Sequence, residues 1–447
     1  MVTLGANRET RRLDRRAPGA TVRALVTLLL AVAAPRVATG QLLGGEIPVN
    51  SYTTDSQWWS AAAPAGNEGF VIVWMGQGDG DANGIYGQRF DASGVPDGDE
   101  FPVNTYTTLL QEIPAVAGDA SGAFVVAWTS YLQEGPALGS GVYAQRFDAS
   151  GVPQGDEFHV NTYTTADQKG VSVAAEPGGE FAAVWWSVGQ DGSAEGVYTQ
   201  RYSAAGVPIG DEERVNSTTA GQQWRPAIAA DAAGNFVVAW SSDGQDGDGH
   251  GVFARQIDSL GLPYGPEIPV NQFTTGEQTA PSVACGAGGD FVVVWTSAGQ
   301  DGSGEGVYGR HFDADGAATG NEVRIHVDTI GDQTDPAVAS DGAGGFLVTW
   351  QGNDSDNAGI LARRLNATGA PAGAEFRVNT YTTSSQSRPA VAATAAGEFV
   401  VTWTSSFQVA PGDDVFAQRV RQAIFEDSFE TAGVCAWSSS AGAGPCP

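Results

Sequence analysis

Apolar positions recur along the chain in short runs separated by turn residues, and the runs follow a fixed order. The run PAVA (114–117) is followed by a Gly-containing turn and then by FVVAW (124–128), where β-branched and aromatic residues are typical of a buried strand. After a loop comes GVYAQRF (141–147), which alternates with a period of two, and after another turn comes EFHVN (157–161). We name these four predicted strands A, B, C and D.

The four-strand unit occurs seven times, and a tryptophan marks strand B of each copy. These residues are spaced about 55 apart: Trp74, Trp128, Trp185, Trp240, Trp295, Trp350 and Trp403. Repeats of four antiparallel strands are typical of β-propeller blades. The sequence therefore predicts an all-β fold, a seven-bladed β-propeller with four antiparallel strands per blade, over residues 41–421. Tandem β-sandwiches are the alternative, which the short repeat disfavours because a sandwich takes about 100 residues.

The two ends of the repeat array predict that the ring is closed. A D-type strand, EIPVN (46–50), precedes the first strand A, whereas the seventh copy stops after its strand C at 418–420. Pairing these segments removes two unpaired sheet edges. We therefore expect the N-terminal strand to complete the last blade.

The regions outside the array point to export. An arginine-rich start, an apolar run (24–34) and the small residues Ala38 and Gly40 predict a signal peptide over residues 1–40. Its apolar run is too short for a bilayer, which needs about 20 residues, so no membrane insertion is expected after signal removal. The predicted location is secreted, extracellular or cell-surface, with the periplasm as the alternative.

The cysteines agree with an oxidising compartment. Cys435 and Cys446 lie in the third region, a C-terminal tail over residues 422–447, and predict a disulfide bond. Cys285 stands in an apolar run and is predicted to be a buried free thiol.

Charge excludes some partners. The chain has 51 acidic and 22 basic residues, a formal net charge of -29, and Lys169 is its one lysine. Removal of residues 1–40 takes away seven arginines and two acids, which leaves 49 acidic and 15 basic residues, net -34. Nonspecific binding to nucleic acid or to anionic lipid is therefore not expected.

The order of the strands sorts the connections between two ends of the ring. The B–C and D–A loops emerge at one end, which we call the loop face, and the A–B and C–D turns emerge at the other, the turn face. The C–D turns are near copies of one another, as in DASGVPDGDE and DASGVPQGDE, whereas the loops vary. Variable loops on a rigid scaffold usually carry recognition, so the loop face is the predicted binding surface.

Residues that break the repeat are the candidates for ligand binding. Each copy has a glutamine at the start of strand A, and the two positions after it differ from copy to copy. An aromatic residue there can stack on a sugar or anchor a protein, and packing between blades is the alternative. The candidate ligand-binding residues are Trp58, Glu112, Trp224, Arg225, Asp335 and Arg388.

Residues that occur once in every copy are interpreted as structural. The seven glutamines are expected to satisfy backbone groups of the D–A loops, with a ring of glutamines at the channel mouth as the alternative. An arginine near the end of strand C and a glutamate at the start of strand D are expected to form cross-strand pairs. Arg419 would then meet Glu46 across the ring closure.

One B–C loop contains a calcium-like pattern. DGDANG (79–84) fits the D-x-D-x-N-G opening of a calcium loop, with oxygen ligands from Asp79, Asp81 and Asn83. Asp and Gly are also preferred in tight turns, which is the alternative reading. Calcium is the one cofactor that the sequence suggests.

The repeat resembles a known bacterial family. The segments FVVVW (291–295), GIYGQRFDASG (84–94) and EFPVNTYTT (100–108) are similar to a VNTYTT-type β-propeller repeat of secreted and cell-surface proteins, some of them calcium-associated and adhesin-like. The tail segment IFEDSFETAGVCAWSSS (424–440) resembles a C-terminal segment of exported proteobacterial proteins. The resemblance implies a Gram-negative source and leaves the activity open.

These observations favour an exported, non-catalytic binding or scaffold propeller that recognises an extracellular glycan or protein through its loop face. No nucleophile elbow, phosphate-binding loop or zinc motif is present in the sequence, and no catalytic residue is assigned. Two alternatives remain open: a propeller hydrolase or lyase acting on polysaccharide, and a calcium-assisted surface adhesin.

Overall fold

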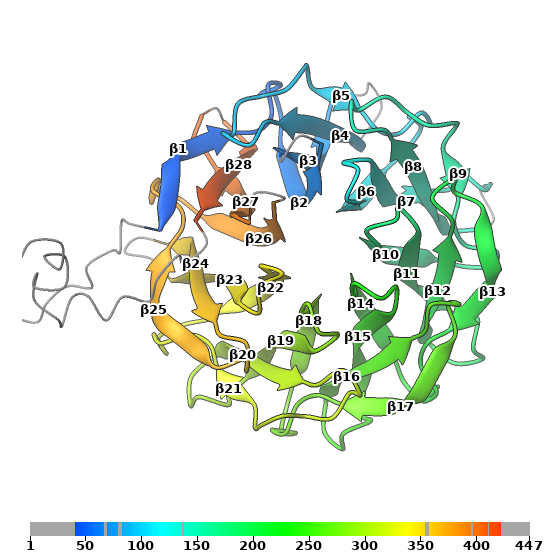
Figure 1. The fold of residues 1–447 in the computed structure, drawn as a ribbon, viewed down its shortest axis with the longest axis vertical. Helices are drawn as coiled ribbons and strands as arrows, with labels where there is room; N and C mark the ends of the chain where they lie inside the picture. The colour runs from blue at the N-terminus through cyan, green and yellow to red at the C-terminus, as the bar shows by residue number, and fades with distance from the viewer. Residues whose placement is uncertain are drawn as a thin grey trace, which may run out of the picture. The chain divides into compact units, whose positions relative to one another are not determined.

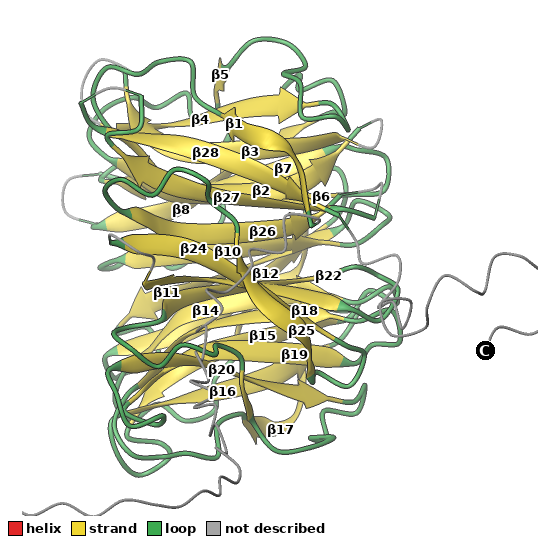
Figure 2. Cartoon of the chain, turned by 90° about the vertical axis from the view of Figure 1, so that its left-hand side faces the viewer, coloured by secondary structure: helices red, strands yellow, loops and turns green. Residues whose placement is uncertain are grey.

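The computed structural model describes residues 41–421 except 67–68, 79–82, 136–137, 354–356, 395–396 and 410. Seven four-stranded antiparallel sheets are arranged radially around a central channel (Figure 1). The strands run between two faces, where the loops and turns gather (Figure 2). The prediction of a seven-bladed β-propeller is confirmed. The described ranges contain no helix, and therefore no helix that is long and apolar enough to span a membrane.

Each blade contributes one strand to each of four concentric positions. The innermost strands, A, are β2 (Gln57–Ala65), β6 (Gln111–Gly118), β10 (Gln168–Ala175), β14 (Gln223–Ala230), β18 (Gln278–Cys285), β22 (Thr334–Ser340) and β26 (Gln386–Ala393). Strands B are β3 (Gly69–Gln77), β7 (Phe124–Tyr131), β11 (Phe181–Val188), β15 (Phe236–Asp243), β19 (Phe291–Ala298), β23 (Phe346–Asn353) and β27 (Phe399–Ser406). Strands C are β4 (Asn83–Phe90), β8 (Ser140–Phe147), β12 (Glu195–Tyr202), β16 (His250–Ile257), β20 (Glu305–Phe312), β24 (Ala358–Leu365) and β28 (Asp413–Val420). The outermost strands, D, are β5 (Phe101–Pro102), β9 (Phe158–His159), β13 (Pro208–Arg214), β17 (Pro263–Pro269), β21 (Val323–Arg324), β25 (Pro371–Arg377) and β1 (Leu42–Pro48).

The ring is closed by the first strand. β1 pairs antiparallel with β28, with Leu42 opposite Val420 and Ile47 opposite Ala417, and Figure 1 shows the two side by side. We number the blades 1 to 7 from β2, so blade 7 consists of β26, β27, β28 and β1. The predicted closure is confirmed.

The hydrophobic core lies between neighbouring blades. In β7, Phe124, Val126 and Trp128 pack against blade 1, whereas Val125 and Ala127 pack against blade 3. Strand B is therefore buried on both faces, which explains its uninterrupted apolar run. The seven strand B tryptophans are fully buried and are the largest side chains of these interfaces.

An asparagine after six of the seven D strands connects the D–A loop to strand C by a hydrogen bond. The Oδ1 atom of Asn161, for example, accepts the N–H of Val142 at 2.7 Å. Because Asn161 uses its side chain in this way, strand D ends at His159 and is shorter than the predicted 157–161. In blade 5 the Nδ1 atom of His326 takes the same place and accepts the N–H of Val307 at 3.0 Å.

The glutamates of strand D do not pair with the arginines of strand C, and this prediction was wrong. In the register of strands C and D, Arg419 lies opposite Leu43, whereas Glu46 lies three residues nearer the loop face. Each glutamate instead accepts a backbone N–H from the D–A loop that enters its blade, as Glu157 does from Thr105 at 2.6 Å. The same bond occurs in all seven blades.

Five of the seven strand C arginines connect neighbouring blades on the turn face, whereas Arg255 and Arg310 donate to Val215 and Val270 after the preceding D strands. Arg89 donates to the carbonyl of Ser150 in blade 2 at 2.6 Å, and Arg419 donates to the carbonyl of Ser93 in blade 1 at 2.8 Å. The glutamines at the start of strand A are fully buried, and six of them donate to carbonyls of their own D–A loop, as Gln168 does to Thr165 at 3.0 Å. Their structural interpretation is confirmed.

Candidate functional site

Every innermost strand contains a bulge two residues after its glutamine, at the loop-side mouth of the channel. The bulge residue has a positive φ in each blade. We call these seven residues the mouth ring: Trp59 (φ 53°), Ile113 (53°), Gly170 (63°), Arg225 (50°), Ala280 (52°), Asp335 (49°) and Arg388 (53°).

Six of the seven mouth-ring residues are strained. The left-handed region is unfavourable for any residue with a Cβ atom, by roughly 1–2 kcal/mol, and most of all for a β-branched residue such as Ile113. Glycine, present as Gly170 in one blade, would remove the cost in the other six. Strain of this kind gathers at functional sites, because the side chain that it positions is needed there. The mouth ring is therefore our candidate functional site.

Arg388 and Trp59 form the first element of the site. The guanidinium carbon of Arg388, in blade 7, lies 4.7 Å from the centre of the Trp59 ring in blade 1. Arg388 is exposed, whereas Trp58 and Trp59 are half-buried and pack against the core between blades 1 and 2. The structure thus places the predicted Trp58 partly in the core and brings Arg388 to its neighbour Trp59.

Arg225 and Trp224 form a second, similar element in blade 4. The Arg225 guanidinium carbon lies 4.6 Å from the centre of the Trp224 ring, and the centres of the Trp224 and His250 rings are 5.8 Å apart. In a ring of seven blades, the boundary between blades 7 and 1 lies opposite blade 4. The two arginine–tryptophan pairs therefore face each other across the channel mouth.

Carboxylates occupy the blades between these pairs on one side. Glu305, at the start of β20, is half-buried and lies near Asp332, Asp335 and Arg225. Burial, together with the charges of the two aspartates, raises the pKa of Glu305, while Arg225 acts to lower it. The structure thus brings the predicted Arg225 and Asp335 around a carboxyl group that the sequence did not single out.

A hydrogen-bonded chain occupies the blades on the other side. The Tyr131 hydroxyl donates to Glu112 at 2.8 Å and accepts from the Lys169 ammonium at 3.1 Å. The Nζ atom of Lys169 also lies 3.3 Å from Oδ2 of Asp167, so the two form an ion pair. Of the candidate ligand-binding residues, Glu112 is therefore the one whose side chain already accepts a hydrogen bond from another described side chain, that of Tyr131.

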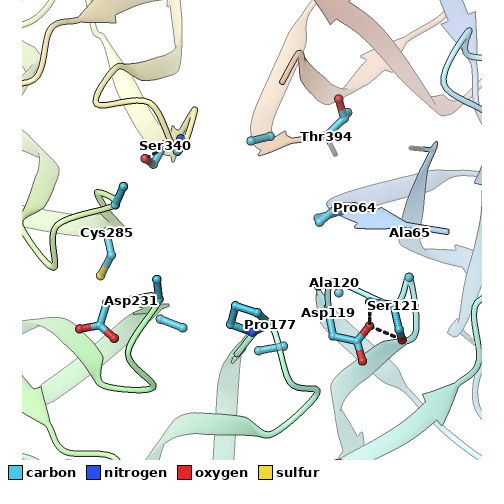
Figure 3. A pocket seen from close by; sticks show the side chains of 18 of the residues that line it. Pro64, Ala65, Asp119, Ala120, Ser121, Pro177, Asp231, Cys285, Ser340 and Thr394 are labelled. Atoms are coloured by element: carbon cyan, nitrogen blue, oxygen red, sulfur yellow. Dashed lines mark hydrogen bonds between the residues drawn. The ribbon is translucent and has the colours of Figure 1, made fainter. Parts of the chain in front are cut away.

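Behind the mouth ring, small residues line the channel. Two positions further along each strand A stands an alanine or a serine, partly exposed: Ala61, Ala115, Ser172, Ala227, Ser282, Ala337 and Ala390. At the turn face the channel opens into a cavity of about 530 Å³ (Figure 3). Its walls are the A–B turns of all seven blades, including Pro64, Ser121, Pro177, Cys285 and Thr394. Sequence reasoning missed this cavity, although the small residues at the end of every strand A were a signal for it.

The polar groups of this cavity serve its own turns. Asp119 accepts the N–H of Ser121 at 2.8 Å, and Asp231 accepts that of Ala233 at 2.8 Å. Cys285 is free, as predicted, but it is only partly buried, at the cavity wall, and the burial of its thiol raises the pKa of that group.

Most residues of the predicted calcium loop and both cysteines of the predicted disulfide lie outside the described residues: Asp79, Asp81, Cys435 and Cys446. Asn83 is buried, with Nδ2 3.7 Å from the Met75 sulfur. In the matching loop of blade 4, Asp246 accepts from Asn271 at 2.8 Å. The described ranges contain no group of three or more His, Cys, Asp or Glu side chains that could hold a metal ion.

The comparisons with known proteins concern the fold. No family model matches the sequence, and no curated protein matches it. A protein of unknown function from Dyadobacter fermentans is similar in structure, with 12% identity, a TM-score of 0.52, and coverage of 84% of this chain and 98% of that one.

Two further structures are less similar. An α-L-arabinofuranosidase from Fusarium graminearum has 13% identity and a TM-score of 0.45, covering 69% of this chain and 92% of that one. The β-propeller domain of the trilobed protease from Pyrococcus furiosus has 9% identity and a TM-score of 0.47, covering 82% and 94%. These likenesses do not bear on the function of the chain.

Proposed function

We propose that this protein is an exported binding module that holds a glycan at the loop-side mouth of its channel. The single observation that carries the proposal is the mouth ring. Seven bulges lie at one register around one opening, and the six that carry a side chain differ in chemistry and hold it at a cost in backbone strain.

The chemistry of the mouth suits a polyhydroxylated ligand. Guanidinium groups donate hydrogen bonds and cannot accept them, whereas carboxylates only accept. Arg225 and Arg388 supply the first kind of group, and Asp335 supplies the second. Because a sugar hydroxyl both donates and accepts, one glycan can satisfy both kinds of group.

A glycan array tests the proposal with the full mature chain, with and without a calcium chelator. We expect binding to at least one glycan, and loss of that binding in the double variant R225G/R388G, which keeps the bulges and removes both side chains. A280G is the matched control, since it changes the backbone at the same register but removes only a methyl group.

Failure to bind any glycan would reject the proposal, as would a double variant that binds like the wild type. Binding of a protein ligand alone would favour the protein-recognition alternative. Chelator-sensitive binding would support the calcium-assisted adhesin alternative.

A second candidate function is hydrolysis of a polysaccharide, and Glu305 favours it. Glu305 is a half-buried carboxyl group whose pKa is raised by burial and by Asp332 and Asp335, a property typical of a general acid. This hypothesis predicts release of reducing ends from a bound polysaccharide, abolished in E305Q. Binding without release of reducing ends would reject it.

A further inference from the structure

We propose that the recognised glycan carries carboxylate groups spaced along an otherwise uncharged chain, and that Arg225 and Arg388 bind them. This inference rests on the proposed function and names the ligand class of the same site.

Two sets of arginines differ in the hydrogen bonds that they make, and this difference leads to the inference. Strand C arginines such as Arg146 and Arg255 donate to backbone carbonyls and so belong to the framework. Arg225 and Arg388 differ, because both are exposed and neither makes a hydrogen bond or an ion pair with any described residue. Within the described residues neither arginine of the mouth ring is therefore neutralised by an ion pair, although the mature chain has 49 acidic and 15 basic residues.

The tryptophan ring in contact with each arginine limits the positions of the guanidinium group, which favours binding of a planar anion. Each guanidinium lies over a tryptophan ring, at 4.6 Å and 4.7 Å from the ring centre, and this cation–π contact restricts its motion. The N–H groups at the edge of the guanidinium plane stay free for a ligand. A carboxylate fits that edge with two parallel hydrogen bonds.

The surrounding charge limits how many anionic groups the ligand can carry. Glu277 pairs with His250, whose ring contacts Trp224, and Glu305 feels the charges of both Asp335 and Arg225. Salt screens charges beyond about 8 Å, so these neighbours matter more than the net charge. A densely charged polymer would bring its other carboxylates against them, whereas a spaced carboxylate meets only the arginine. A phosphate group, with more than one negative charge, is disfavoured for the same reason.

The test compares acidic polysaccharides with their carboxyl-reduced forms, in which each carboxylate becomes a hydroxymethyl group. Glucuronoxylan represents spaced carboxylates, polygalacturonate and alginate represent dense ones, and a phosphorylated mannan and an acidic peptide complete the panel. Affinities are measured for the wild type, for R225Q/R388Q, and for R214Q/R324Q, a control with two exposed arginines of outer strands β13 and β21.

We expect the wild type to bind the spaced acidic glycan at least about ten-fold more tightly than its reduced form, since charge-assisted hydrogen bonds are lost on reduction. R225Q/R388Q should lose this preference while R214Q/R324Q keeps it. Unchanged melting temperatures would show that the variants are folded.

The outcomes separate this inference from the proposed function. Equal binding of acidic and reduced glycans would overturn the inference and leave glycan binding standing. Stronger binding of polygalacturonate or of the phosphorylated mannan would overturn the spaced-carboxylate class. Binding of the acidic peptide alone, or of no ligand in this panel and on the array, would overturn the proposed function as well.

Discussion

The two mouths of the channel are built from the same seven strands but differ in nearly every other respect. At the turn face, small residues such as Ala65, Pro177 and Ala232 line the cavity, and the aspartates there cap their own turns. At the loop face, large and charged residues stand on strained bulges, and neither Arg225 nor Arg388 forms an ion pair with a described residue. The polar groups of the turn face are therefore used within their own turns, whereas the loop face presents charged side chains on a bulge that six of the seven blades keep without glycine.

The largest effect is expected at the turn face, for G122A. Gly122 has φ +85°, and a Cβ atom there would lie 2.2 Å from the Cα and N atoms of Gly66 in blade 1. We expect a loss of about 2–4 kcal/mol in the free energy of unfolding, measured with denaturant. Gly98 has φ +89° and open space around it, so G98A should show the backbone cost alone. Equal losses in the two variants would contradict the close packing of blades 1 and 2.

An intermediate effect is expected for the framework variant E267Q. Burial acts to raise the pKa of Glu267, but the N–H groups of Ser217 and Thr218 and the Gln245 amide outweigh it, so the pKa is lowered. This contribution is present at neutral pH and is lost in acid, as pH falls through the lowered folded-state pKa. We expect E267Q to lose roughly 1 kcal/mol at pH 7, and the difference from the wild type to shrink in acid.

The exposed Asp211 offers a control for E267Q, since D211N changes the same formal charge at a residue without a hydrogen bond to its side chain in the described part. If D211N lost as much free energy of unfolding as E267Q, net charge would account for the effect, and not the hydrogen bonds that the strand D glutamates accept from the D–A loops.

A smaller effect separates strain from side-chain contact at the loop face. R388A and R388G both lose the contact with Trp59, but only glycine relieves the left-handed backbone. R388G should therefore be more stable than R388A by about 0.5–1 kcal/mol in denaturant unfolding. A less stable R388G would show that the bulge is not strained.

The smallest effect, with the opposite sign to E267Q, is expected for E305Q. Because the pKa of Glu305 is raised, ionisation of this group destabilises the folded state, and its favourable contribution is lost as pH rises through the folded pKa. E305Q should therefore raise the melting temperature slightly at pH 7 and leave it unchanged below about pH 4. If E305Q lowered the melting temperature at pH 7, the ionised Glu305 side chain would stabilise the fold, contrary to this prediction.

The sequence by itself determined the parts of this protein that repeat. Seven copies of one apolar pattern predicted the blades and the fully buried tryptophans, and the strand missing from one end predicted that β1 would close the ring. These features could be predicted because each depends on alternation within a strand and on pairing with the next one, which the chain order fixes.

Tertiary structure alone decided which variable residues meet. Arg388 lies over Trp59 only because the closed ring makes blade 7 the neighbour of blade 1. Arg225 and Asp335 both act on the charge of Glu305 because blades 4, 5 and 6 converge on one mouth. The sequence also did not reveal the strained bulges, because Trp59, Ile113 and Arg388 are not residues that signal a left-handed backbone. The failed pairing of Arg419 with Glu46 has the same origin, since a register offset of three residues is set by the packing of the strands and not by their composition.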